Sequence, residues 1–346
     1  MKSKKIAVSV AMAVTVAILG CAVVLFGMMR LHAGTKAASV NGAEITAGEI
    51  KLRINALKAD AVSHFEEEYG EDDSESGFWD KRFGDETPSQ YLRGRALESA
   101  ARIKLEQQLA LQYGLTDDIS YSAMLKKMSQ TNSQNEAAIA DGQPVYGQKS
   151  YNETTFFEYT LSNMRLSLQK KMSEKGGELY ADNEKLKSYY NSIRDEYYKK
   201  ADNISFYLLT ADASEQSQLE GATALFLSGG SDKISERFPA VKLEKIELHN
   251  DNSSDYSKRN RNIYEKVSTL GAGEQSGIII DENGAHTAVV TARSSGGYKQ
   301  FTEIYDALKA QYAAEQYELY IDALAEKYKP QAESVLNKIP INEELK

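Results

Sequence analysis

Apolar residues recur at helical spacing through most of the first two hundred positions. After Thr46, five of them fall on one helical face: Ile50, Ile54, Leu57, Ala61 and Phe65. Thr46 and Glu49 match a capping box, in which a hydroxyl and a carboxylate satisfy the free amides of a first turn. The pattern predicts a helix that fades in the acidic stretch Glu66 to Glu75, which we interpret as a solvated loop.

Four further helices are expected before residue 200. Thr87, Pro88 and Gln90 predict the start of the first, because a hydroxyl cap, a proline at the first position and a glutamine at the third favour a helix start. Gly114 is a fitting end for this helix. The other three are expected over residues 120–141, 153–175 and 183–200.

The pattern changes at residue 204, where short β-branched and aromatic runs predict strands over 204–209 and 243–248. A helix is expected over 216–227, a long polar loop over 249–262 and a short helix over 263–270. The runs 278–280 and 287–291 flank Asp281-Glu-Asn-Gly284 and predict a hairpin. A helix over 301–329 follows. The apolar stripe of this last helix must be buried against another part of the chain. We expect it to pack on the N-terminal helices, which makes the α+β block an insertion in the helical region.

The N-terminus predicts export of everything after Arg30. Three lysines precede the apolar run Ile6 to Met29, which is long enough to cross a bilayer, and the basic flank should stay in the cytoplasm. We favour an uncleaved transmembrane signal anchor at 6–29, after a cytoplasmic stub at 1–5 and before a linker at 30–39. A lipoprotein modified at Cys21 and a cleaved signal peptide remain alternatives.

The composition argues against several classes of function and of site. The 346 residues carry a net charge of -9, which argues against nucleic-acid binding because phosphate contacts need a basic face. A single cysteine excludes an intrachain disulfide, and the four histidines (His32, His64, His249 and His286) are too scattered for a zinc site. No metal or other cofactor is expected.

Several motifs resemble the SurA/PrsA family of extracytoplasmic foldases. Val40-Asn-Gly-Ala-Glu-Ile-Thr46 looks like the opening "V-N-G-x-x-I-T" of that family. The segment from Phe78-Trp79 through Phe83-Gly84 to Tyr91-Leu92 is similar to a signature of Gram-positive members. Phe301-Thr-Glu-Ile304 resembles the segment that follows the family's isomerase domain. The resemblance implies a helical chaperone domain at 40–200, completed by a C-terminal helix at 298–335, with a tail at 336–346.

The central block, 201–297, resembles a parvulin-type peptidyl-prolyl isomerase domain. Leu270-Gly-Ala-Gly-Glu-Gln-Ser276 is similar to the parvulin "L-x-x-G-E-v-S" turn, and Asn283-Gly-Ala-His286-Thr to its closing strand. The resemblance therefore places His286 at the position of an active-site histidine. Phe206 stands where parvulins have a second histidine, Ser268 stands where they have a pocket phenylalanine, and the glycine-rich strand has no counterpart. His286 is thus either a catalytic residue or a vestigial strand residue.

The predicted fold class is α+β, with a discontinuous helical chaperone domain and an inserted parvulin-like domain. The predicted function is a membrane-anchored foldase that binds unfolded exported polypeptides outside the cytoplasm, with isomerase activity weakened or lost. The sequence allows a homodimer and does not decide between a monomer and a dimer. A fully active isomerase and a membrane-tethered scaffold for one partner are the alternatives. Aromatic residues are the candidate substrate contacts, although core packing is their common role: Phe78, Trp79, Phe83, Tyr91 and Phe206, with Phe156, Phe157 and Tyr159 as a second group.

Overall fold

The computed structural model describes residues 31–343 and 345. The expected anchor at 6–29 and the alternatives for Cys21 lie outside this range. Within it, no helix combines the length and the apolar character that crossing a membrane requires. The chain divides into two compact units: the first runs to Tyr180 and resumes at Ala313, and the second is Ala181–Tyr312. Helices and two antiparallel sheets confirm the α+β class.

The first unit begins with a small sheet of order β2-β1-β7. Its strands are β1 (Lys36–Val40), β2 (Ala43–Thr46) and β7 (Gln331–Ala332). Asn41 and Gly42 join the first two with φ angles of 46° and 79°, as a tight two-residue hairpin turn requires. The segment 30–39 was expected to be a linker, but it supplies β1, because Ala37, Ala38 and Val40 are buried in the core.

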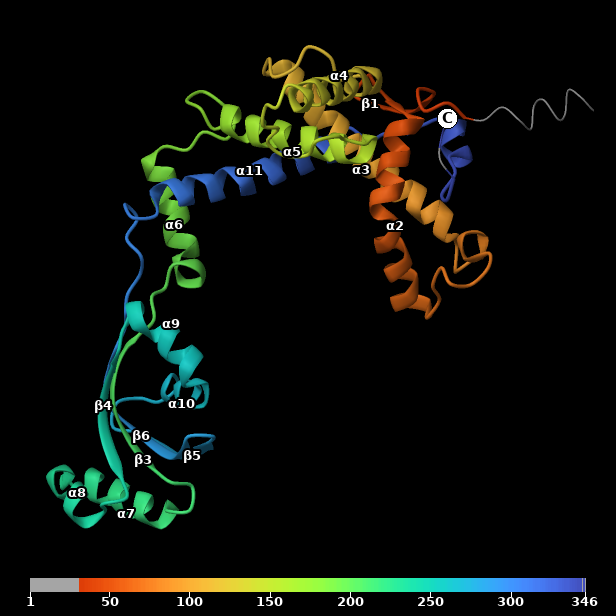
Figure 1. Ribbon diagram of the computed structural model, residues 1–346. Helices are drawn as coiled ribbons and strands as arrows, with labels where there is room; N and C mark the ends of the chain where they lie inside the picture. Colours follow the sequence, from red (N-terminus) through yellow and green to blue (C-terminus); the bar gives the residue numbers. More distant parts are fainter. Residues whose placement is uncertain (1–30, 344, 346) are drawn as a thin grey trace, which may run out of the picture. The chain divides into compact units, whose positions relative to one another are not determined.

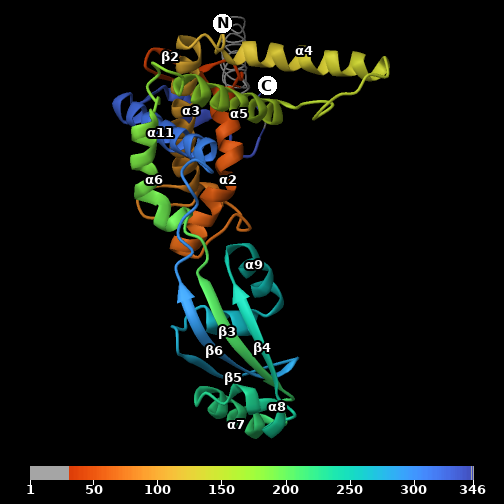
Figure 2. The ribbon, with the colours of Figure 1, turned by 90° about the vertical axis from the view of Figure 1, so that its left-hand side faces the viewer.

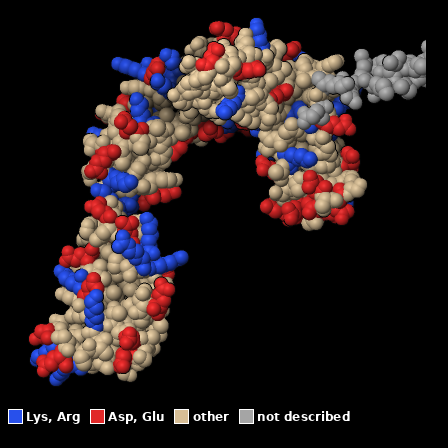
Figure 3. Space-filling view, in the orientation of Figure 1, with Lys and Arg blue, Asp and Glu red and all other residues tan. Residues whose placement is uncertain are grey.

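Four long helices follow in the first unit: α2 (Ala47–Tyr69), α3 (Pro88–Gln112), α4 (Tyr121–Ala140) and α5 (Glu153–Met172). A short 3-10 turn, η1 (Phe78–Asp80), lies between α2 and α3. Both predicted capping boxes, Thr46 with Glu49 and Thr87 with Gln90, are confirmed. In Figure 3, acidic side chains gather around the end of α2 and the loop after it, where the sequence has its acidic run.

The chain returns to this unit through the last part of α11 (Tyr305–Lys327). Tyr317 and Ile321 are fully buried against apolar residues of α3 and α5. The turn η3 (Ser334–Lys338) and the residues after it then enter the main core, where Ile339 is fully buried. The ammonium group of Lys51 donates to the carbonyls of Pro340 and Ile341, at 3.0 and 2.8 Å. Residues that were expected to form a tail therefore help to close the first unit.

The second unit contains a four-stranded antiparallel sheet of order β4-β3-β6-β5 (Figure 2). The strands are β3 (Asn203–Ala211), β4 (Lys242–Leu248), β5 (Gln275–Asp281) and β6 (Gly284–Ser294). The helices are α6 (Asn183–Tyr197), α7 (Gln216–Leu227), α8 (Ile234–Arg237), α9 (Asn250–Arg259) and α10 (Arg261–Val267), with the turn η2 (Ser231–Lys233). The domain boundaries proposed at 200/201 and 297/298 stay a prediction.

Apolar side chains form a layer on each face of this sheet, and Figure 1 shows α9 and α10 next to the sheet. Phe206 and Val290 face α9 and α10, whereas Leu209 and Val289 face α7 and α8. The predicted β5–β6 hairpin is confirmed. Gly284 needs to be glycine because its φ is 126° and a Cβ there would lie 2.4 Å from the carbonyl oxygen of Ala211.

The loop predicted over 249–262 is wrong, since α9 occupies most of it. The backbone N–H of His249 donates to Asn252 Oδ1 at 2.8 Å, and Ser253 Oγ donates to the carbonyl of His249. The ring of Tyr256 lies 6.0 Å from that of Phe206, edge to face. Local caps and one packed aromatic ring therefore outweigh a composition that favours loops.

Candidate functional site

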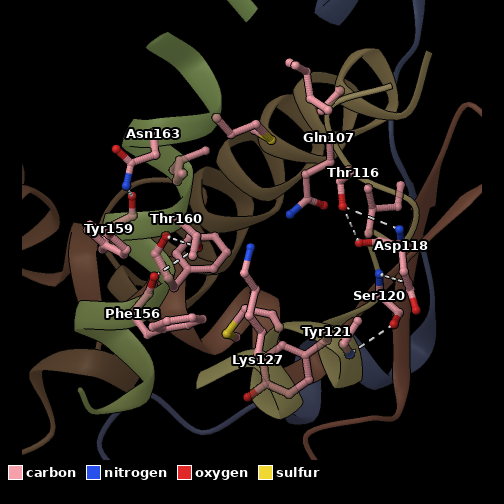
Figure 4. Close-up of a pocket in the computed structure, with 18 of the residues that line it drawn as sticks. Gln107, Thr116, Asp118, Ser120, Tyr121, Lys127, Phe156, Tyr159, Thr160 and Asn163 are labelled. Atoms are coloured by element: carbon pink, nitrogen blue, oxygen red, sulfur yellow. Dashed lines mark hydrogen bonds between the residues drawn. The ribbon is translucent and has the colours of Figure 1, made fainter. Parts of the chain in front are cut away.

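A cavity of about 750 Å³ lies within the first unit, between α3, the loop 115–120, α4 and α5 (Figure 4). Phe156 and Tyr159 line one side, and Gln107, Thr116 and Asp118 line the other. The apolar lining includes Met124, Met164, Leu115 and Phe157. Protein pockets that bind ligands commonly have a volume of about 300–1,000 Å³ and mostly apolar walls, so this hollow has the size and lining of a binding site.

Local hydrogen bonds shape the loop that forms the polar wall. Thr116 Oγ1 donates to the carbonyl of Asp118, and Asp118 Oδ1 accepts from the backbone N–H of Ser120 at 2.8 Å. The backbone N–H of Ser120, followed by its side chain, lowers the pKa of the exposed Asp118 carboxyl by hydrogen bonding. Ser120 also caps α4 by accepting from the N–H of Ala123. The loop therefore ends where α4 starts, which fixes one border of the cavity.

Tyr121 anchors the start of α4 against α2. Its ring is buried over Gly48, where a Cβ would lie 2.5 Å from Tyr121 Cζ. The Tyr121 hydroxyl donates to the carboxylate of Glu153 at the start of α5. Burial, followed by this bond to Glu153, raises the pKa of Tyr121. One residue thus connects three helices at the edge of the cavity.

Buried charged groups connect the helices that surround the cavity. Lys104 Nζ on α3 lies 2.5 Å from Glu49 Oε1 and donates to the carbonyl of Ile119 at 3.1 Å. Two residues further along α3, Glu106 accepts three hydrogen bonds from Arg165 of α5 and one from Tyr317 of α11. These networks satisfy buried charges and fix the helices around the hollow.

His286 lies on β6, almost completely buried, at 4% exposure. Its Nδ1 lies 3.0 Å from Thr210 Oγ1, and its Nε2 lies 3.1 Å from Asp281 Oδ1. An ionised carboxylate only accepts, so Nε2 carries a proton, and in the neutral ring Nδ1 accepts from the Thr210 hydroxyl. Both ring nitrogens therefore have partners within the sheet.

Phe206 lies on the same face of the sheet as His286 but four residue pairs further along it. Thr210 is the residue of β3 opposite His286, and Phe206 is opposite Val290. Four residues of strand separate Phe206 from Thr210, which corresponds to about 13 Å. Phe206 is fully buried in the apolar layer under α9 and α10. The two candidates share a face, but they do not form one compact site.

The other predicted aromatic contacts gather in the first unit. Phe78 and Phe83 are buried against Phe65, with ring centroids 6.0 and 5.3 Å from it. Trp79 and Tyr91 pack at the margin of this cluster and are partly exposed. This packing favours a structural role in the core for these four aromatic residues. Their contact with client proteins stays a prediction. The second aromatic group, Phe156, Phe157 and Tyr159, lines the cavity described above.

Among the described residues, no group of three or more histidine, cysteine, aspartate or glutamate side chains could hold a metal ion. Sequence reasoning did not identify the polar wall of the cavity, Gln107 and the loop 115–120, as part of a site. The signal that was available is the cluster of three aromatic residues at the start of α5.

No protein-family profile matches the chain. A curated relative, the chaperone for lacto-N-biosidase from Bifidobacterium longum subsp. longum, is 30% identical over 146 residues. The matched region is 41% of this chain and 51% of that protein, so the chain spans about half the length of the curated relative it matches.

The chain is also similar to solved structures of chaperones and foldases. A SurA-like chaperone from Campylobacter jejuni, from a study of PEB4 and Cj1289, aligns with 86% of this chain and 99% of its own, at 14% identity and a TM-score of 0.31. The foldase PrsA from Streptococcus pneumoniae aligns with 90% and 96%, at 12% identity and a TM-score of 0.22. PrsA from Lactococcus lactis aligns with 88% and 98%, at 13% identity and a TM-score of 0.24.

Proposed function

We propose that this chain is a chaperone or foldase that acts outside the cytoplasm, tethered by residues 6–29, and binds unfolded segments of exported polypeptides. The cavity between α3, α4 and α5 carries the proposal. Methionines and aromatic rings line it, and unbranched methionine side chains adapt to clients of different shape. A surface of this kind recognises apolar segments without one fixed ligand geometry.

The curated relative supports this class of function. Its name describes a chaperone for one enzyme, and 146 aligned residues connect it to this chain. The same name favours a second candidate, a tethered chaperone or scaffold that serves a single partner. The two candidates differ in breadth, because a general chaperone protects many unrelated unfolded proteins and a dedicated one captures a single protein.

Prolyl isomerisation is weak or lost in this proposal. Catalysis would need a site that binds the twisted amide better than either planar form. Here both nitrogens of His286 are engaged by Thr210 and Asp281, and Phe206 is packed in the core. A proline-limited refolding assay tests this part: wild type and His286→Ala should both match the uncatalysed rate. An acceleration that His286→Ala removes would instead establish an active isomerase.

Aggregation of several unrelated unfolded proteins, followed by light scattering, tests the chaperone proposal. Tyr159 lines the cavity and is 51% exposed, so Tyr159→Ser should remove client contact without unfolding the chain. Leu166 lies on the same helix, is 66% exposed and is not among the residues that line the cavity, so Leu166→Ser is the matched control. We expect Tyr159→Ser to bind clients about tenfold more weakly, since a buried aromatic contact contributes about 1 kcal/mol beyond its area.

Equal protection by the wild type and both variants would rule out the cavity as the client site. Failure of the wild type to protect any client, together with tight capture of one native protein, would favour the single-partner candidate. The tether is tested separately: the mass of the N-terminal peptide distinguishes an intact anchor from a lipid on Cys21 or a cleaved signal.

A further inference from the structure

The two edges of the sheet in the second unit have opposite character. At one edge, β4 presents four charged residues, Lys242, Glu244, Lys245 and Glu247, which pair with one another along the strand. Charged side chains on an edge strand oppose pairing with another chain. At the other edge, the six residues of β5 before Asp281 read Gln-Ser-Gly-Ile-Ile-Ile, with no charge and no proline.

The outer edge of β5 is open for backbone pairing. Its partner is β6, and no other strand of the described residues lies beyond it. Asp281 and Gly284 flank the hairpin loop, so Asp281 and Ile279 direct their backbone groups toward β6. Ile278 and Ile280 then direct theirs outward. Ile280 also exposes 57% of its surface at this edge, next to those unpaired groups.

We propose that this edge of β5 captures an extended apolar segment of a client polypeptide as an additional strand. The inference deepens the proposed function and rests on it, because an unfolded client supplies the free backbone. Main-chain hydrogen bonds to Ile278 and Ile280 give affinity without reading sequence, and Ile280 favours β-branched or aromatic neighbours in the added strand.

The length of the edge favours a transient client over a second copy of this chain. A shift in register between Gln275 and Ile278, at Gly277 with φ 69°, limits the regular edge to residues 278–281. Four residues span about 13 Å and offer few hydrogen bonds. A stable dimer interface commonly buries about 1,200–2,000 Å², which an edge of this length does not supply. Repeated capture and release of short segments suits it better.

Amide hydrogen exchange on the full-length chain tests the inference. The probe is an uncharged eight-residue peptide that is rich in valine, threonine and tyrosine. We expect its binding to slow exchange at the N–H groups of Ile278 and Ile280 and to leave β4 unchanged. N-methylation of alternate peptide residues should abolish binding in one register and spare it in the other, because successive residues of a strand pair on opposite sides.

Ile280→Lys should weaken peptide binding about tenfold, since it places a charge at the edge and disturbs one or two backbone hydrogen bonds. Leu227→Lys is the matched control: Leu227 ends α7 in the same unit and is 50% exposed. It should bind the peptide like the wild type. Both positions are solvent-exposed, and the melting temperatures of the variants report on folding.

Three outcomes would overturn the inference. Unchanged exchange at Ile278 and Ile280 with bound peptide would place the peptide elsewhere. Equal binding by Ile280→Lys and the wild type would also show that the peptide binds elsewhere. Concentration-dependent dimers that Ile280→Lys dissolves would assign the edge to a second copy. If these tests fail while the wild type still protects unfolded clients, the strand-addition site is wrong and the chaperone function stands.

Discussion

Lys104 of α3 and Glu49 of α2 form an ion pair at 2.5 Å, with side chains that are only 3% and 8% exposed. Glu49 also accepts from the backbone N–H of Thr46 and completes the cap of α2. The pair therefore joins the start of α2 to α3, and Glu49 also lines the cavity. Charges that are buried this deeply must be matched, because desolvation of each ion is costly.

Replacing Lys104 with methionine should strongly destabilise the first unit. The change keeps the length of the side chain but leaves Glu49 as a buried carboxylate without its cation. We expect a loss of about 3–5 kcal/mol in the free energy of unfolding, measured by urea denaturation. The control is Lys171→Met, because Lys171 pairs with Glu174 on the surface, where solvent screens the pair, and its loss should change stability little. Similar losses for both variants would contradict this account.

Two glycine-to-alanine changes within helices should have opposite effects. A Cβ on Gly48 would lie within 2.7 Å of three atoms of the Tyr121 side chain, so Gly48→Ala should cost about 1–3 kcal/mol and loosen α4. A Cβ on Gly94 meets nothing within 4 Å, so Gly94→Ala should stabilise α3 by about 1 kcal/mol. Melting temperatures compare the two variants. A stabilising Gly48→Ala would show that Tyr121 can move away without cost.

Two threonines in the sheet of the second unit test the role of His286. Thr210→Val removes the hydroxyl next to His286 Nδ1 and leaves a buried ring nitrogen without its donor. We expect a loss of about 1–3 kcal/mol in the free energy of unfolding. Thr291→Val removes an exposed hydroxyl from the same sheet and should change stability by less than about 0.5 kcal/mol. If Thr210→Val behaved like this control, the bond to His286 would contribute little to stability.

Local signals in the sequence predicted most of the elements. The caps at Thr46 and Thr87 and the loop Asp281–Gly284 each depend on residues that are close together in the chain, and all are confirmed. The predicted polar loop over 249–262 failed because the evidence against it is tertiary. Tyr256 secures α9 by packing on Phe206, which lies fifty residues earlier in the chain.

The site was harder to predict than the fold. Tyr159 belongs to an aromatic group that the sequence marks out, but the opposite wall, Gln107 and Thr116, comes from α3 and the loop after it. Only the packing of α3 against α5 brings these walls together, and no local spacing encodes that contact. The C-terminal segment is similar: Ile339 and Ile341 are buried in the core of the first unit, and Lys51, nearly three hundred residues earlier, donates to the carbonyls of Pro340 and Ile341.

Tyr256 gives a prediction for alkaline pH. Its hydroxyl is buried and has no hydrogen-bond partner among the described residues, and burial followed by nearby Glu244 raises its pKa to about 12. Tyr256→Phe removes the unpaired hydroxyl and keeps the ring on Phe206. It should therefore stabilise the second unit by about 1 kcal/mol at neutral pH.

The sign of the pH effect follows from that raised pKa of Tyr256. The folded state holds the phenol proton more tightly than the unfolded chain, whose tyrosine pKa is 10.0. The stability contributed by the bound proton is complete below pH 10 and is lost as the pH rises toward about 12. Urea midpoints across this range should fall less steeply for Tyr256→Phe than for the wild type. Tyr146→Phe, at a residue that is 91% exposed, should follow the wild type, and identical slopes for all three proteins would contradict the assignment to Tyr256.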